Sequence, residues 1–210
     1  NDLTEVYFRV LLHSTNAEDE FYSKVVAKKK NTTQEAINTG KQYQAKGDLT
    51  NAITQYKLAL ELNPNNAQVE KDLNAVVAKQ KQALFTEIFT KYKKGFGEVD
   101  NELKQARLRT QRKTEFANIL DGLSVTSWRG KVKRLETNSE GKAIFAVTIP
   151  DGNYSSDIEI KTWNNALSDV FDNTLIEGDS PLFDVLIDLS KKQKVEFSGN
   201  FISSEEDYIK

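Results

Sequence analysis

The 210-residue sequence contains no cysteine, no methionine and a single histidine, His13. Without cysteine, disulfides, thiolate-bound metals and a cysteine nucleophile are excluded. One histidine excludes histidine-rich metal sites and makes histidine-based acid–base catalysis a poor expectation. His13 lies in an apolar segment, which indicates a structural role. No apolar run approaches the ~18 residues that a membrane-spanning helix needs, so we expect no such helix.

The missing methionine bears on the N-terminus, because a chain read from its initiation codon starts with that residue. We expect either that a leader has been removed or that the sequence is part of a longer chain. The first alternative favours an exported protein of the bacterial cell envelope. The absence of cysteine fits every compartment, the cytoplasm included.

The net charge of −2 conceals three segments of different charge. Residues 1–90 carry equal numbers of acids and bases, residues 91–135 carry a net charge of +7, and residues 136–210 carry −9. The acidic last third would repel a phosphate backbone, because nucleic-acid affinity rests mainly on cations that neutralise phosphates. The basic middle segment either attracts an acidic partner or neutralises the acidic third, and the second is the more common use of such blocks.

Apolar residues recur at steps of three, four and seven over residues 67–93, which predicts a helix with one apolar face. Gly95 and Gly97 are expected to interrupt it, and a second helix is expected over residues 98–120. This second helix is rich in arginine and lysine, so we expect much of its circumference to face water. Its thin apolar stripe consists of Val99, Leu103, Ala106, Ala117 and Leu120.

Another helix is expected to begin at Asn16, whose side chain can cap it, and to end at the lysines of residues 28–30. Acidic residues follow Asn16 and the lysines lie at the opposite end, which is the arrangement that the helix dipole favours. Residues 3–12 are apolar and fit either a helix or a strand, and we favour the helix.

Residues 33–66 predict two helices joined by a tight turn. Thr32 and Glu35 have the spacing of a capping box at the start of the first helix. Gly47 can take the left-handed conformation that ends this helix, and Asp48 can cap the second one. The second helix is expected to stop before the segment's proline, because proline disfavours helical backbone in the residue before it.

This hairpin resembles the tetratricopeptide repeat, a helix–turn–helix unit of 34 residues. Small residues stand where its two helices would cross, and larger ones surround the crossing. Two positions depart from the family pattern: alanine replaces the frequent tryptophan at position 36, and Thr39 replaces a frequent leucine. The signature spacings are occupied by Ala36, Gly40, Tyr43, Ala52, Tyr56, Ala59 and Pro64, with Tyr56 in place of the usual phenylalanine.

Only one clear copy of the repeat is present, and one repeat cannot bury its own apolar face. Residues 16–30 and 67–93 are therefore expected to cover the hairpin on its two sides. The resemblance implies either a purely structural hairpin or a protein partner bound to the inner face of the first helix. The residues that family geometry would place on that face are Ile37, Asn38, Lys41 and Gln44.

After Gly122 the apolar period changes to two, which predicts strands. The order of three strands, a short helix and a fourth strand resembles the OB fold, a five-stranded and partly open barrel. Another small barrel or sheet is the alternative, and the tail also resembles OB-like tails of uncharacterised bacterial proteins, which implies no activity. We expect the fifth strand to be missing, so that the domain is incomplete at its C-terminus. Strands are expected over residues 128–133, 143–149, 158–162 and 195–201, an acidic loop over 164–179, and the helix from Ser180-Pro181.

OB folds that bind single-stranded nucleic acid combine a basic groove with aromatic platforms. Against that use stand the acidic balance of residues 136–210 and the scarcity of exposed aromatics, since Trp128 is expected in the core. The candidate contacts for nucleic acid or for an acidic partner are Arg129, Lys131, Lys133 and Trp163.

No catalytic or metal-binding motif is apparent. Acidic residues are plentiful over residues 169–188, but the EF-hand spacing, the glycine-rich phosphate loop, the nucleophile elbow and the zinc helix are missing. We therefore expect no catalytic residue, metal or cofactor. A carbohydrate-active enzyme, the least favoured alternative, would need two carboxylates that face each other in a cleft.

These patterns together predict an α+β protein. A helical domain with one tetratricopeptide-like repeat is expected at residues 1–93, a basic helical connector at 94–122 and a small OB-like β-barrel at 123–210. The expected function is a non-catalytic interaction or scaffold protein, in which the repeat binds a protein partner and the barrel offers a second surface. The alternative is a single-stranded nucleic-acid-binding protein that uses the barrel.

Overall fold

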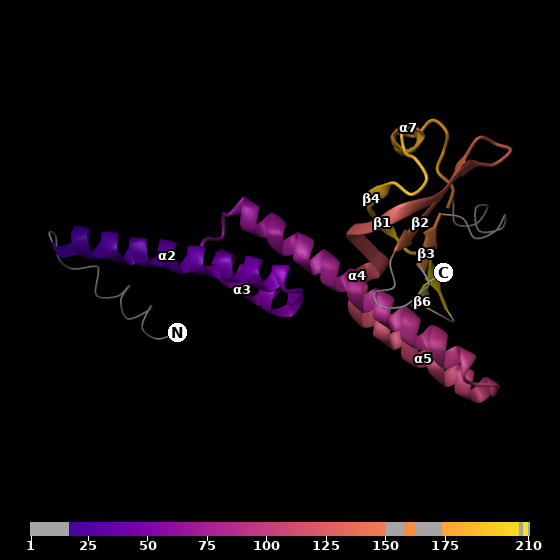
Figure 1. Ribbon diagram of the computed structural model, residues 1–210, viewed down its shortest axis with the longest axis horizontal. Coiled ribbons are helices and arrows are strands. Elements are labelled where there is room, and N and C mark those ends of the chain that lie inside the picture. Colours follow the sequence, from indigo (N-terminus) through magenta and orange to yellow (C-terminus); the bar gives the residue numbers. More distant parts are fainter. Residues whose placement is uncertain (1–16, 150–157, 163–173, 206–207, 210) are drawn as a thin grey trace. The chain divides into compact units, whose positions relative to one another are not determined.

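The computed structural model describes residues 17–149, 158–162, 174–205 and 208–209. The fold is mixed α+β, because helices occupy the N-terminal half and an antiparallel sheet follows in the C-terminal part (Figure 1). His13, residues 3–12 and Trp163 lie outside the described residues. Within the described residues, no helix is long and apolar enough to cross a membrane.

The chain divides into two compact units, Asn1–Val77 and Ala78–Lys210, and the division falls within helix α4. The helices are α2 (Ala17–Ala45), α3 (Leu49–Leu62), α4 (Ala67–Gly97), α5 (Glu102–Ile119) and α7 (Pro181–Ile187), with a 3-10 turn, η1, at Asp121–Leu123. The strands are β1 (Ser124–Thr137), β2 (Ala143–Ile149), β3 (Ile158–Lys161), β4 (Lys194–Asn200), β5 (Ser203–Ser204) and β6 (Tyr208–Ile209).

Helices α2 and α3 form the hairpin expected from the sequence, and its turn is built as predicted. Gly47 has a φ of +80°, and the N–H of Asp48 donates to the carbonyl of Tyr43 across the end of α2 (3.0 Å). The Asp48 carboxylate accepts a hydrogen bond from the N–H of Asn51 (3.1 Å) and so caps α3. α3 ends just before Pro64. The predicted helix end, cap and stop signal are confirmed.

α2 is one continuous helix of 29 residues, which corrects two expectations. The hydroxyl of Thr32 donates to the carbonyl four residues before it (3.0 Å), as the hydroxyl of Thr33 does (2.8 Å). Hydroxyls bonded in this way lie inside a helix and do not cap one, so the capping box of Thr32 and Glu35 is wrong. Residues 17–30 are the first half of the hairpin's own helix, not a separate helix that covers it.

The hairpin closes where Gly40 of α2 meets Tyr56 of α3. Tyr56 is fully buried, and a Cβ at Gly40 would lie 3.0 Å from its Cε1 atom, so the small residue permits the close approach. Val69 and Val76 of α4 belong to the same buried cluster, which confirms that the start of α4 covers the hairpin. The other members of the cluster are Ala36, Ile37, Ala52 and Ala59.

In the second unit, four strands form an antiparallel sheet in the order β3-β2-β1-β4. The central strand β1 changes register between Val125 and Trp128 against β4, and between Val132 and Arg134 against β2. Such bulges bend a strand and increase its twist. The order of three strands, a helix and a strand is confirmed, with β1 longer than expected.

The sheet is open, because β3 and β4 form its edges. Within the described residues no fifth strand joins it, and β5 and β6 pair with each other in a separate two-stranded sheet. The domain therefore has an OB-like order of elements without the closed barrel. Before α7, the described part of the loop expected over residues 164–179 bridges to the sheet between Ile176 and Ala143. The predicted start of α7 at Ser180-Pro181 is confirmed, and the Ser180 side chain caps the helix.

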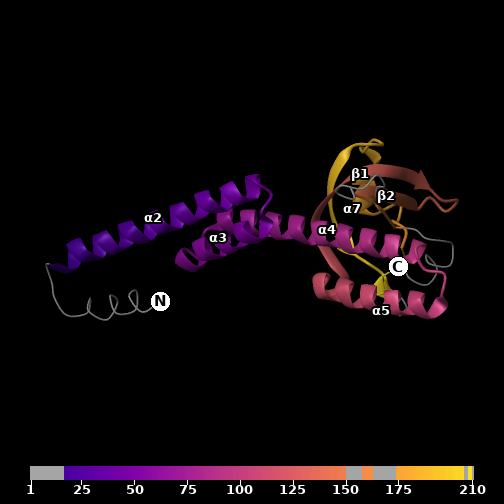
Figure 2. The ribbon, with the colours of Figure 1, turned by 60° about the horizontal axis from the view of Figure 1, so that its bottom comes forward.

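The core of the second unit lies between one face of the sheet and helices α4 and α5 (Figure 2). Phe85 of α4 is at its centre, with ring centroids 5.1 Å from Phe116, 5.0 Å from Trp128 and 5.4 Å from Phe201. Trp128 is 1% exposed, so its predicted place in the core is confirmed.

Helix α5 packs through its C-terminal end, where Phe116 and Leu120 are buried in this core. The apolar stripe predicted for it is wrong at Leu103, which is 82% exposed. Helix α4 continues through Gly95 as far as Gly97, so the interruption predicted at Gly95 is also wrong. Packing of neighbouring aromatic residues on the core outweighs the low helix propensity of glycine.

Candidate protein-interaction surfaces

The first candidate surface is the face of α2 that carries the predicted partner contacts. Asn38 and Lys41 are exposed on it, and the amide oxygen of Asn38 accepts a hydrogen bond from Gln34 Nε2 (3.1 Å). Ile37 differs from the prediction, since it is 8% exposed and lies in the buried cluster that includes Val69 of α4. Burial in this cluster removes Ile37 from the surface and leaves this face polar.

Gln44, the fourth predicted contact, is half-buried and hydrogen-bonded to Tyr56 of α3, and the charge of Asp72 on α4 acts on the same tyrosine. The hydroxyl of Tyr56 donates to Gln44 Oε1 (2.8 Å). Burial raises the pKa of Tyr56, and the negative charge of Asp72 on α4 raises it further. Gln68 Nε2 donates to Asp72 Oδ1 (2.8 Å). Gln44 and Asp72 are therefore held in position by the fold itself.

Asp72 was not among the residues predicted from the sequence. It follows Asn38 by 34 residues, which is the length of one repeat, so projection of the period onto α4 could have found it. The signal is weak because Asn74 stands where the next repeat would have a small residue.

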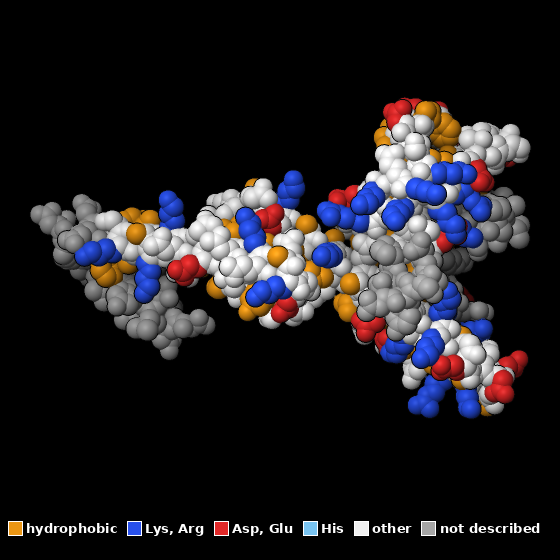
Figure 3. Space-filling view, viewed as in Figure 1, with side chains coloured by type: hydrophobic (Ala, Val, Ile, Leu, Met, Phe, Trp, Pro, Cys, Tyr) orange, Lys and Arg blue, Asp and Glu red, His pale blue; other side chains and the backbone are white. Residues whose placement is uncertain are grey.

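The second candidate surface is the solvent face of the sheet, where basic side chains gather over β1 and β4 (Figure 3). Arg129 Nε lies 3.5 Å from the carboxylate of Glu196 on β4, and Lys133 donates a hydrogen bond to Glu159 on β3. Lys131, between these two ion pairs along β1, has a lysine as its cross-strand neighbour on β4. The predicted cations on this face are Arg129, Lys131 and Lys133, all exposed.

The acidic groups of this face are held by its own cations. The hydrogen bond from Lys133 lowers the pKa of Glu159, and the charges of Lys161 and Arg134 lower it further. No ion pair formed by the described residues involves Lys131 or Lys194. The uncompensated positive charge is therefore concentrated at the end of the β1–β4 ladder where β4 begins.

The described residues offer little for catalysis or metal binding. No group of three potential metal ligands occurs among them, and none of their carboxylates is buried. Glu115 of α5 accepts hydrogen bonds from Lys91 Nζ (2.6 Å) and from the hydroxyl of Tyr92 (2.8 Å) on α4. These hydrogen bonds join α4 to α5 beside the core, so the role of the three residues is structural.

Comparison with known proteins finds a match for the helical hairpin of the first unit. Residues 40–70 match the family model of the TPR repeat, over the end of α2, all of α3 and the start of α4. No curated protein and no solved structure matches the chain. TPR repeats are typically non-catalytic modules, so the match suggests a role in protein–protein interaction or as a scaffold.

Proposed function

We propose that the protein is a non-catalytic interaction or scaffold protein in which the exposed face of α2 binds a segment of a protein partner. The observation that carries this proposal is that the TPR match falls on a hairpin whose α2 face is polar and exposed. Asn38 and Lys41 supply hydrogen-bond donors there, and the hydroxyl of Tyr56 fixes the orientation of Gln44. Side chains fixed before binding lose less conformational entropy when a partner arrives.

The solvent face of the sheet is the second binding surface of this proposal. Lys131 and Lys194 repel each other, and a carboxylate between them would remove that repulsion. An acidic segment of a protein partner therefore fits this face. Arg129 and Lys133 are already paired with Glu196 and Glu159, so only the two lysines between these pairs attract an acidic partner. The acidic segment that binds there would therefore be short.

Site-directed photo-crosslinking in the whole chain tests the α2 surface. A benzophenone amino acid replaces Asn38 or Lys41, and in the matched control it replaces Lys57, which is exposed on α3. We expect the same protein to be crosslinked from positions 38 and 41 and not from position 57. Lys41→Glu should weaken its capture about tenfold, a loss of roughly 1.4 kcal/mol, whereas Lys57→Glu should not. Equal crosslinking from all three positions would contradict the proposal.

A second candidate function is the binding of single-stranded nucleic acid on the same face of the sheet. The Lys131–Lys194 pair favours it, because a phosphate could bridge the two lysines. The two ion pairs beside them oppose it, since they occupy the other cations that a backbone would need. A fluorescent oligonucleotide titrated at low and at high salt separates the candidates. Tight binding at low salt that weakens steeply with added salt would support nucleic acid.

A further inference from the structure

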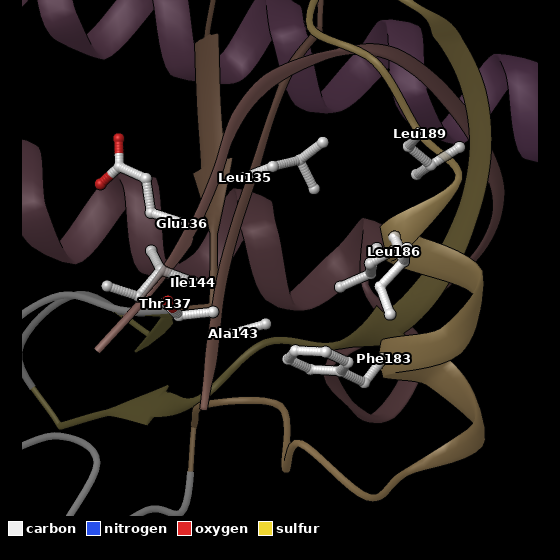
Figure 4. Close-up of a pocket in the computed structure, with 9 residues that line it drawn as sticks. Leu135, Glu136, Thr137, Ala143, Ile144, Phe183, Leu186 and Leu189 are labelled. Carbon is white, nitrogen blue, oxygen red and sulfur yellow. The ribbon is translucent and has the colours of Figure 1, made fainter. Parts of the chain in front are cut away.

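An apolar pocket lies at the end of the second unit that carries α7. Its volume is about 410 Å³, and it opens between α7 and the adjoining ends of β1 and β2. Leu135 of β1 faces Phe183 and Leu186 of α7 across it (Figure 4). Ile187, which also lines the pocket, is 67% exposed.

Two further aliphatic side chains lie beside the pocket on the same short helix. Leu182 is 53% exposed and Val185 is 58% exposed, and their spacing of three residues places them on one side of α7. Exposed aliphatic side chains gathered around a pocket typically mark a binding surface. The pocket and these side chains form what we call the α7 patch, defined by Leu135, Leu182, Phe183, Val185, Leu186 and Ile187.

Acidic side chains border the α7 patch and restrict what can cover it. Glu136 lines the pocket and lies 3.8 Å from Arg134 Nε, whereas Asp184 on α7 and Asp188 at its C-terminal cap are exposed. Two copies of the patch placed face to face would bring these acids together, and like charges repel at close range. The occupant must therefore combine an apolar side chain with basic ones.

Helix α5 of the same chain presents that combination. Leu103, in its first turn, is 82% exposed. Lys104 and Arg107 are exposed beside it, and Arg107, four residues on, shares its side of the helix. α5 and α7 both belong to the second unit and lie at opposite ends of it (Figure 1), so Leu103 cannot reach the α7 patch of its own copy.

We propose that the protein self-associates head to tail, with Leu103 of one copy inserted into the α7 patch of the next. Arg107 and Lys104 would then face the acidic border formed by Glu136, Asp184 and Asp188 of the next copy. This one contact would cover both the exposed Leu103 of α5 and the exposed apolar side chains of the α7 patch. The two contacting surfaces differ, so the association is heterologous and builds rings or open chains rather than a symmetric pair.

Sedimentation velocity on the whole chain and two variants tests the proposal. Leu103→Asp removes the inserted side chain, and Ile187→Lys places a cation in the patch; both residues are mostly exposed, so the fold should tolerate the changes. We expect the mass of the unmodified protein to rise with concentration and each variant to stay monomeric. An equimolar mixture of the two variants should form a one-to-one dimer and nothing larger, because it contains one intact pair of surfaces.

The control variant is Leu84→Asp, because Leu84 is a helix leucine, 39% exposed, that lines neither surface. It should associate as the unmodified protein does, and circular dichroism should show all variants folded. A protein that stays monomeric at every concentration overturns the proposal. Self-association that Ile187→Lys abolishes and Leu103→Asp leaves intact also overturns it, because the patch would then pair with a surface other than α5.

Discussion

Lys131 of β1 lies directly opposite Lys194 of β4, although the neighbouring cross-strand pair joins Arg129 to Glu196. Opposite charges in such pairs stabilise a sheet, and like charges directly opposite each other destabilise it. The fold thus tolerates a repulsive pair at the end of its β1–β4 ladder. The acidic segment proposed above as a partner would relieve this repulsion.

Lys194→Glu should stabilise the protein. It converts the repulsive pair into an attractive one, and we expect the free energy of unfolding to rise by about 0.5–1 kcal/mol at low salt. Urea denaturation measures the change, which should shrink in 1 M salt because exposed charges are screened (~3 Å Debye length). Lys191→Glu, at an exposed position outside the strand, is the control and should have no comparable effect. A loss of stability for Lys194→Glu would refute the repulsion.

Gly40→Ala should destabilise the first unit, although alanine normally favours helices. The new Cβ would lie 3.0 Å from Tyr56 Cε1, and Tyr56 cannot yield easily because it is buried and bonded to Gln44. We expect a loss of about 1–2 kcal/mol, since overpacking outweighs the propensity gain. Gly95→Ala is the matched control: its Cβ would meet Leu108 at an ordinary 3.6 Å, and up to ~1 kcal/mol should be gained. Thermal unfolding of both variants gives the comparison.

Local signals predicted the fold well where neighbouring residues decide the structure. Gly47 ends α2 and Asp48 caps α3 because each acts on backbone groups within a few residues of itself. Strand β2 was predicted with its observed bounds, because a short apolar segment between two turn signals is typical of a buried strand.

The predictions failed where contacts between residues far apart in the sequence determine the conformation or the burial of a side chain. A threonine such as Thr32 can cap a helix or bond back within one, and the choice depends on whether the helix continues beyond it. Ile37 belongs to the family's binding face by spacing, but it lies in the buried cluster of the first unit. Leu103 continues an apolar stripe by periodicity, yet the packing of α5 against the core starts only at Leu108. The partner-binding role of Asn38, Lys41 and Gln44 stays a prediction.

Tyr56→Phe should destabilise the hairpin, although phenylalanine is the residue that tetratricopeptide repeats usually have at this position. The variant keeps the buried ring and loses the hydroxyl that donates to Gln44 Oε1 (2.8 Å). We expect a loss of about 1 kcal/mol, the usual net contribution of one hydrogen bond. In a double-mutant cycle with Gln44→Ala, the two losses should be less than additive. Full additivity would show that the hydroxyl and Gln44 do not interact.

Glu115 should make stability depend on pH in the acid range. The hydrogen bond from Lys91 lowers the pKa of Glu115 below its ordinary value of 4.5, and the hydroxyl of Tyr92 lowers it further. Because the folded-state pKa is the lower one, the stabilising contribution is complete above about pH 4.5 and is lost as the pH falls through the folded-state value.

Glu115→Gln removes the charge and tests this dependence. The difference in unfolding free energy between the unmodified protein and the variant should be largest near neutral pH and should disappear once the pH is well below the folded-state pKa of Glu115. Urea denaturation across that range provides the measurement, with Glu87→Gln, an exposed glutamate on α4, as control. A difference that stays constant with pH would mean that the substitution acts through packing, because only the loss of a titrating carboxylate makes the difference follow the protonation of Glu115.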